Sequence, residues 1–350
     1  MKENDRMLKK VNMREGGVRE SWIDVLKGIG IILVVIGHTS MENPLVKWIY
    51  VFHMPLFFAL SGYMFGRGRK QYTFVKFTEK RTQSLLLPFI IFRILLVIYW
   101  IIIESHFRNL DLGPIWFLIV LYIVELAAYI ILEKISLYVD CLFVLGVFCI
   151  LYYILLQESS ITGWKAWEVR IINAFIWYVV GAIVGKFQIK WNEKRKLEIG
   201  LSKKIFILIC LFFISIWSGM SNSLVSMWSN CFGKYPLWII GNVSGSLFIA
   251  CLCKWVITES RIIEWYGRYT IIILATHEPI KRVILKCSEI LLNKCNIGIT
   301  TDNLQTNIIT SLIVVAMVMI IEILVIKIFQ WIKSRFPESI QKNWLGWIYS

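Results

Sequence analysis

The sequence predicts an all-α protein, a polytopic bundle of about ten transmembrane helices. Of its 350 residues, 57% are hydrophobic and only 17% are charged, whereas an ordinary soluble domain carries about 25% charged residues. Apolar runs of roughly 20 residues recur along the chain, which is the length a helix needs to cross a hydrocarbon core. In lipid the backbone must satisfy its own hydrogen bonds, so long apolar runs indicate helices.

Ten apolar segments account for these runs. The predicted spans are residues 22–40, 45–65, 84–103, 114–132, 137–156, 170–187, 204–219, 235–256, 269–291 and 306–331. The breaks between them carry turn-forming residues, such as Glu42-Asn43-Pro44. We therefore expect loops between the spans rather than a second folded domain.

The segment 269–291 is the least apolar of the ten. Its ionisable side chains include His277, Glu278, Lys281, Arg282 and Lys286. Such residues are costly on a helix that faces lipid. We therefore expect this segment to be tilted, broken or lining a water-filled cavity.

Positive charge is distributed unevenly between alternate loops. With the N-terminus in the cytoplasm, the segments on that side carry 25 Lys and Arg residues and the opposite loops carry 4. Cytoplasmic loops collect Lys and Arg, so both termini are predicted to be cytoplasmic. The net charge of +15 then needs no nucleic-acid partner. The predicted organisation is a basic tail at 1–21, a transmembrane domain at 22–331 and a C-terminal tail at 332–350.

Two pairs of glycines lie four residues apart within predicted spans. They are Gly181 with Gly185 and Gly241 with Gly245. Small residues at this spacing let two membrane helices approach closely. We expect both pairs to mark helix contacts and assign them no other role.

The first span carries the residues with the clearest chemical signal. Lys27 and His38 are eleven residues apart, which places both on one helix face and about 16 Å apart along the helix axis. Asp24 lies one turn before Lys27, where an ion pair is expected. Because ionisable groups inside a membrane are candidates for function by default, all three are predicted site residues.

A second histidine follows on the next span, in the block Phe52–Phe58 (FHMPLFF). The chain reverses near residues 41–45, so His53 returns to about the depth of His38. A histidine can take up and release a proton near neutral pH, which suits general-base catalysis on a hydroxyl. The bland interpretation, a buried histidine bonded to a carbonyl, is less favoured for two histidines at matching depth.

The loop after the second span and the start of the third are strongly basic. The positive residues there include Arg67, Arg69, Lys80 and Arg81. They predict either a cytoplasmic site for a phosphate-rich ligand or the ordinary positive charge of a cytoplasmic loop. The pattern alone favours the second interpretation.

Three further ionisable residues, Arg93, Glu125 and Glu322, lie deep in spans. Charged groups at this depth commonly pair with one another or with the backbone. We expect interhelical pairs there rather than catalysis. The cysteines and histidines show no spacing typical of a metal site, so no metal is expected.

Several segments together resemble the membrane acyltransferase 3 family. They are Ile23–His38 (Lys-x10-His), Phe52–Tyr63, Phe77–Phe89, Trp116-Phe117-Leu118 and Ile273–Ile280. The resemblance is most specific where the Lys-x10-His spacing and the second-span block occur together. Within the family, the sequence is most similar to the sugar O-acetyltransferases of the fucose-acetylase-like branch.

This resemblance implies an O-acyltransferase of the cell membrane, with residues 22–331 as its acyltransferase domain. It implies a cytoplasmic acyl-CoA donor, commonly acetyl-CoA, and an acceptor hydroxyl on an extracytoplasmic or lipid-linked glycan, as in exopolysaccharide biosynthesis. His38 corresponds to the essential histidine of the family, Lys27 to its basic partner and His53 to the second-helix histidine. Arg81 matches the first position of an Arg-x-x-Arg motif whose second position holds Ser84 here.

These observations combine into one hypothesis. Basic groups near the cytoplasmic mouth hold the CoA phosphates, namely Lys27, Arg67, Arg69, Lys80 and Arg81. The thioester arm reaches His38 and His53, one of which deprotonates the sugar hydroxyl or is itself acylated first. The residues expected to hold the acceptor or support the histidines are His277, Glu278 and Trp116.

Two other functions compete with this hypothesis. An exporter or flippase for a polysaccharide or lipid-linked sugar would also suit a bundle with one charged span. Such transporters often contain a twofold internal repeat, which this sequence lacks. A non-catalytic structural or sensor subunit is the other alternative, and it would tolerate changes at Lys27 and His38.

Overall fold

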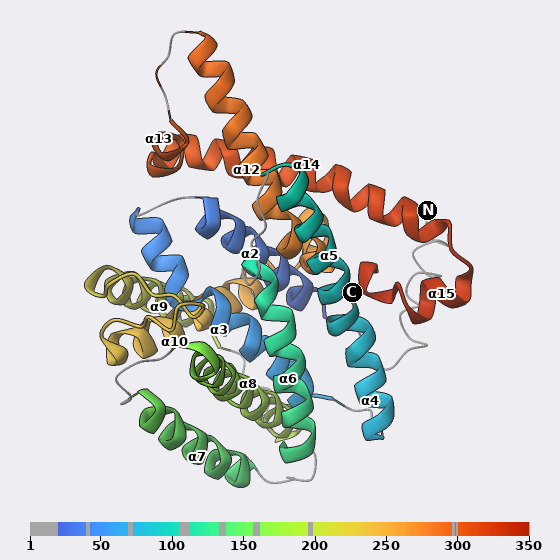
Figure 1. The fold of residues 1–350 in the computed structure, drawn as a ribbon. Coiled ribbons are helices and arrows are strands. Elements are labelled where there is room, and N and C mark those ends of the chain that lie inside the picture. The colour runs from blue at the N-terminus through green and yellow to red at the C-terminus, as the bar shows by residue number, and fades with distance from the viewer. Residues whose placement is uncertain are drawn as a thin grey trace.

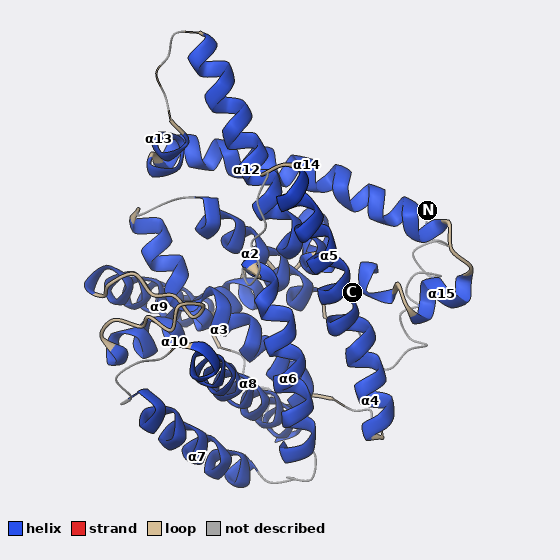
Figure 2. Cartoon of the chain, viewed as in Figure 1, coloured by secondary structure: helices blue, strands red, loops and turns tan. Residues whose placement is uncertain are grey.

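The computed structural model describes most of the chain from residue 20 onward. The described residues are 20–39, 43–68, 73–104, 112–132, 138–156, 162–194, 199–295, 298 and 300–349. Over these residues the regular structure is helical, apart from one isolated bridge between Ser226 and Cys231 (Figure 2). The predicted all-α fold class is confirmed.

The helices pack as a bundle in which α3, α6 and α8 lie side by side and α7 lies against α8 (Figure 1). In chain order the elements are α2 (Ser21–Thr39), α3 (Pro44–Gly66), α4 (Phe74–Arg81), η1 (Thr82–Leu86), α5 (Leu87–Ile102), η2 (Gly113–Ile115), α6 (Trp116–Leu132), α7 (Tyr138–Leu156), α8 (Gly163–Lys194), α9 (Leu201–Ser221), α10 (Tyr235–Trp255), α11 (Arg261–Arg268), α12 (Thr270–Lys294), α13 (Thr301–Thr306), α14 (Ile308–Ser334), α15 (Glu338–Asn343) and η3 (Gly346–Tyr349). Each predicted span coincides with one of the long helices.

Within the described residues, 8 helical segments are long and apolar enough to cross a membrane. The other two predicted spans are α7, whose apolar part Asp140–Leu156 is shorter, and α12, which carries charged side chains. The chain is therefore a multi-pass integral membrane protein. The cytoplasmic placement of both termini stays a prediction.

Glycines bring α8 and α10 into close contact with α3. A Cβ built on Gly181 of α8 would lie 1.8 Å from the carbonyl oxygen of Ala59, and one on Gly245 of α10 would lie 2.4 Å from the Phe52 ring. A larger residue would push the helices apart, which is why small residues mark such interfaces. The predicted helix contacts at the glycine pairs are confirmed.

The third span contains a π-helical turn that the sequence pattern does not predict. The helices α4 and α5 continue into each other through η1, which spans Thr82–Leu86. π-helical turns are rare and occur frequently at functional sites. This turn follows Arg81 directly and includes Ser84, two positions of the predicted basic motif.

The end of the chain packs against the bundle instead of forming a free tail. The Trp347 side chain is 4% exposed, and its ring centroid lies 5.6 Å from that of Phe92 and 6.2 Å from that of Phe329. Burying one large apolar side chain stabilises a fold by about 1.5–3 kcal/mol. That gain explains why the apolar end of the predicted tail 332–350 docks onto α5 and α14.

Candidate active site

Three histidines from three different helices meet in the structure. His38 lies at the C-terminal end of α2, His53 in α3 and His277 in α12. The His38 ring centroid is 5.1 Å from that of His277 and 6.3 Å from that of His53. Tyr50 packs beside this group, with its ring centroid 4.8 Å from that of His53. The two histidines expected at matching depth thus lie together, and His277 joins them.

The helix backbone sets the orientation of all three imidazoles. Nδ1 of His38 lies 2.8 Å from the Val34 carbonyl oxygen. Nδ1 of His53 and of His277 makes the same contact with the carbonyl four residues earlier, at 3.0 and 2.7 Å. A carbonyl oxygen can only accept a hydrogen bond, so Nδ1 carries the proton in each ring. Each neutral imidazole is therefore left with a lone pair on Nε2, where it can act as a base.

His38 and His53 line a cavity of about 1010 Å³, which we name the His38 cavity. Its walls come from α2, α3, α5, η2, α6 and α12, and also from the loop 222–234 and from α13. Its aromatic lining residues are Tyr50, Tyr99, Trp100, Trp116 and Trp228. Ligand pockets commonly measure about 300–1,000 Å³, so this cavity can admit a ligand of several rings.

Charged side chains of α12 form a connected network on the wall of the His38 cavity. Lys281 Nζ donates to the carbonyl oxygen of His38 at 2.9 Å and pairs with Glu278 at 2.7 Å. Arg282 pairs with Glu278 at 3.1 Å and with Glu104 at 3.3 Å. The predicted ninth span is thus unbroken and turns these charges toward a cavity. Through Lys281, the network also holds the end of α2 that carries His38.

A second cavity of about 250 Å³, which we name the Lys27 cavity, is lined by Lys27, Arg81, Ser84 and Glu125. Arg81 Nε lies 2.7 Å from the Glu125 carboxylate, which confirms the interhelical pairing expected of Glu125. Two cations and one carboxylate give this lining a net charge of +1. A net positive cavity favours an anionic ligand.

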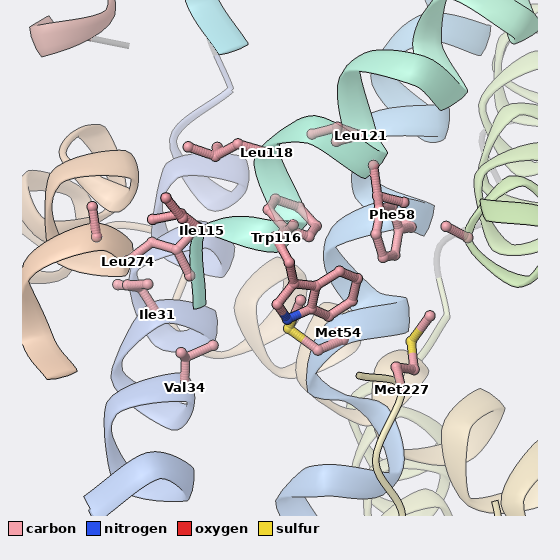
Figure 3. Close-up of a cluster of buried hydrophobic side chains, with 14 of the residues drawn as sticks. Ile31, Val34, Met54, Phe58, Ile115, Trp116, Leu118, Leu121, Met227 and Leu274 are labelled. Atoms are coloured by element: carbon pink, nitrogen blue, oxygen red, sulfur yellow. The ribbon is translucent and has the colours of Figure 1, made fainter. Parts of the chain in front are cut away.

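The two cavities adjoin at an apolar junction. Met54 and Leu274 line both of them. Figure 3 shows these two side chains in the buried apolar cluster, together with Ile31 and Val34 of α2. The junction therefore separates a cationic cavity from one that contains imidazoles, both along the same helix.

Three predicted site residues that the structure describes, Asp24, Arg67 and Lys80, line neither cavity and lie apart from the histidine group. Asp24 is buried in the first turn of α2, where Gly267 of α11 packs against its carbonyl group. Lys80 is exposed on α4. These positions separate the three residues from the histidines and from the Lys27 cavity.

Arg67 lies at the end of α3 and is engaged by neighbouring polar groups. It pairs with Glu20 at 2.5 Å and donates to the Tyr63 hydroxyl at 3.1 Å. The hydrogen bond from Arg67 lowers the pKa of Glu20 below its ordinary value. Arg67 thus joins the start of α2 to the end of α3. Arg69, another basic residue of the predicted ligand site, lies outside the described residues.

The remaining predicted residues lie at the histidine group. Glu278 and Trp116 line the His38 cavity, whereas His277 is fully buried behind it. Three residues that shape this cavity are not predicted by the sequence pattern, namely Tyr50, Glu104 and Trp228. Tyr50 lies one helical turn before His53, so helix periodicity around that histidine would have found it. The other two come from segments that only the tertiary structure brings to the cavity.

Fold and site together define a class of protein: a multi-pass membrane protein with a histidine centre beside two adjoining cavities. The family model described as an acyltransferase domain matches residues 20–327. The chain belongs to this family, the acyltransferase 3 family of membrane acyltransferases. The resemblance drawn from the sequence motifs is therefore confirmed.

Two curated relatives are similar to short parts of the chain, and both are described as nodulation protein NolL. The protein from Sinorhizobium fredii is 34% identical over 106 residues, which cover 27% of this chain and 29% of the relative. The protein from Mesorhizobium japonicum is 38% identical over 81 residues, which cover 20% of this chain and 22% of the relative. The chain thus matches less than a third of the length of either relative. No solved structure matches it.

Proposed function

We propose that the protein is an O-acyltransferase that transfers an acyl group, most simply acetyl, from cytoplasmic acyl-CoA to a hydroxyl of an extracytoplasmic or lipid-linked glycan. The observation that supports this proposal is the junction at Met54 and Leu274, where the cationic Lys27 cavity adjoins the His38 cavity. A donor and an acceptor that arrive from opposite sides of a membrane need two openings and one shared centre. Membership of the acyltransferase family supports acyl transfer as the reaction.

The Lys27 cavity suits the phosphate groups of CoA. Lys27 and Arg81 supply the positive charge, and hydrogen bonds between charged partners are roughly twice as strong as neutral ones. Ser84 offers a hydroxyl where the family motif has its second arginine. The excess of Lys and Arg in alternate loops supports placing this cavity toward the cytoplasm. The uncharged thioester arm would then cross the apolar junction.

Acyl transfer in the His38 cavity needs one base. Nε2 of His38 removes the proton of the acceptor hydroxyl while the hydroxyl oxygen attacks the carbonyl carbon of the thioester. The C–O bond forms, the C–S bond breaks, and the imidazolium returns its proton to the departing thiolate. The products are a sugar ester and free CoA. In the alternative sequence, Nε2 attacks the thioester first and the acyl-imidazole then transfers the acyl group to the hydroxyl.

The other two imidazoles support His38 in this proposal. Nε2 of His277 is buried without a hydrogen-bond partner among the described residues, and its ring packs against that of His38. It can therefore accept a hydrogen bond from the imidazolium form of His38 during transfer. His53 also lines the His38 cavity, and in this proposal it contacts the acceptor hydroxyl.

The proposal is tested by replacing His38. Isolated membranes are supplied with labelled acetyl-CoA, and the surface glycan of cells with and without the protein is compared by mass spectrometry. We expect His38→Ala to lower transfer by about 10²–10⁴-fold, the range for loss of a general base. His38→Asn is the matched variant, because it keeps a donor near the Val34 carbonyl but offers no base. It should be equally inactive at an equal amount of inserted protein.

Two outcomes would contradict the proposal. Wild-type transfer rates in both His38 variants would remove this histidine from the mechanism. A wild-type protein that transfers nothing from acyl-CoA to glycan would remove acyl transfer itself and favour the exporter alternative. The mass added to the glycan distinguishes acetyl from larger acyl groups.

A further inference from the structure

Two indole rings stand side by side on the wall of the His38 cavity. Trp116 begins α6, and Trp228 lies in the loop 222–234 between α9 and α10. Their ring centroids are 6.0 Å apart and their planes meet at 39°. Trp228 is partly exposed although it is large and apolar. The acyl-transfer chemistry of the histidines leaves Trp228 without a role.

The loop that carries Trp228 is held rigidly at both ends. The Asn222 side-chain oxygen accepts hydrogen bonds from the backbone N–H groups of Ser223 and Lys234, at 3.0 and 2.7 Å. Gly233 has a φ of +58°, a conformation that other residues rarely adopt. A Cβ at Gly233 would lie 2.2 Å from the Asn222 side-chain oxygen. The loop therefore presents its residues in a preorganised shape.

Arg170 of α8 holds Trp228 itself. Its Nε and Nη2 atoms both donate to the carbonyl oxygen of Trp228, at 3.0 and 2.5 Å. Its guanidinium lies 4.3 Å from the ring centroid of Trp228 and 4.7 Å from that of Trp167, distances typical of cation–π contacts. A buried arginine thus fixes the indole that faces the cavity.

The charges of the two cavities point to different ligands. The three cations and three carboxylates that line the His38 cavity sum to zero, and they are Lys281, Arg282, Lys286, Glu104, Glu278 and Asp302. The Lys27 cavity has a net charge of +1. A polyphosphate is therefore favoured in the Lys27 cavity, and an uncharged ligand with many hydroxyl groups is favoured in the His38 cavity. Carboxylates can accept hydrogen bonds from such hydroxyls.

We propose that Trp116 and Trp228 form a subsite that stacks a pyranose ring of the acceptor, with Arg170 as a positioning residue for Trp228. A sugar ring has an apolar C–H face, which suits an aromatic surface, and a rim of hydroxyls, which suits the polar lining. This inference rests on the proposed function and names the acceptor class as an uncharged sugar ring. The adenine of the donor is the competing occupant, because it also stacks on indole. Its attached phosphates disfavour it in a cavity without net positive charge.

The test separates acceptor binding from donor binding. Membranes containing Trp228→Ala, Trp228→Leu or Trp228→Phe are assayed with acetyl-CoA and with surface glycan from the same cells after mild alkaline removal of its esters. We expect Trp228→Ala to raise the KM for glycan about fivefold and to leave the KM for acetyl-CoA unchanged. Trp228→Leu fills the space without an aromatic face and should behave like Trp228→Ala. Trp228→Phe keeps an aromatic face and should stay within about twofold of wild type.

Two controls sharpen this result. Trp164→Ala removes an indole that is 84% exposed on α8 and lines neither cavity, so both KM values should stay unchanged. Arg170→Gln should raise the KM for glycan in the same direction as Trp228→Ala. Because Arg170 acts through Trp228, the double variant should be no worse than Trp228→Ala alone. Additive effects would overturn the positioning role of Arg170.

Several outcomes would overturn the subsite, and one also reports on the enzyme function. If Trp228→Ala fails to fold, Trp228→Leu decides the question. An unchanged KM for glycan in the folded variants would overturn the subsite while wild-type activity upholds the proposed function. A raised KM for acetyl-CoA would assign the indoles to the donor and overturn it as well. If the wild-type protein transfers no acyl group to glycan, both the proposed function and the subsite are contradicted.

Discussion

The Lys27 cavity and the His38 cavity lie along the same helix, α2, but are built differently. The first measures about 250 Å³, is lined by helices alone and has a net charge of +1. The second measures about 1010 Å³, has balanced charges and includes residues from the loop 222–234 and from α13. A CoA donor would be the same in every reaction and suits a small helical site, whereas acceptor glycans vary and suit a wider site shaped by loops.

The largest effect is expected at the junction between the two cavities. Leu274 lines both sides, and Leu274→Trp would fill the passage. We expect transfer to fall on the order of 10²-fold, because small misplacements of reacting groups cost that much. Leu274→Met, which conserves volume, should retain activity. Both variants are compared at equal amounts of folded protein, and near-normal transfer by Leu274→Trp would show that the donor does not pass here.

The donor side is tested by the cation of α2. Lys27→Ala should raise the KM for acetyl-CoA about tenfold, since a hydrogen bond to a charged group contributes roughly 1.5–3 kcal/mol. The KM for glycan should not change. Lys76→Ala is the matched control, because Lys76 is exposed on α4 and lines neither cavity. If Lys27→Ala changed only the KM for glycan, the Lys27 cavity would bind the acceptor and not the donor.

The acceptor side is tested through the backbone contact of His38. Lys281→Met removes the donor to the His38 carbonyl oxygen while preserving much of the side-chain volume. We expect kcat to fall about fivefold with little change in either KM, because one hydrogen bond contributes about 1 kcal/mol. Lys281→Arg should recover part of the loss. A change confined to the KM for acetyl-CoA would contradict a positioning role.

The smallest effect is expected where the helices α2 and α3 meet outside both cavities. Glu20→Gln removes the ion pair with Arg67 and should lower the melting temperature by about 1–2 °C at neutral pH. Arg67 lowers the pKa of Glu20 below 4.5, so the pair stabilises the fold above that pH and is lost as the pH falls through the lowered pKa. The melting temperatures of wild type and variant should therefore converge in acid. The transfer rates of the two proteins should stay equal. A large loss of transfer would place this pair in the site after all.

More of the fold than of the candidate site could be predicted from the sequence. Each of the ten predicted spans coincides with a long helix, and 8 helical segments of the described residues are long and apolar enough to cross a membrane. The helices could be located because a backbone in lipid must satisfy its hydrogen bonds within the segment. Helix periodicity also related Lys27 to His38. The partners of His38 on α12 could not be derived, because the contact between Lys281 and the His38 carbonyl joins segments 243 residues apart. Nor does any local pattern indicate the π-helical turn after Arg81.

The helical class, the membrane location, the family and the spacing of the amine and the imidazole on the first span could all be read from the sequence. Those features depend on composition and on local periodicity, which act within one helix. Three features depend on the packing of distant segments: the charges of α12 face a cavity, three imidazoles meet, and Trp228 lies on the cavity wall beside Trp116. Such contacts join distant segments, and their energies depend on how whole helices pack.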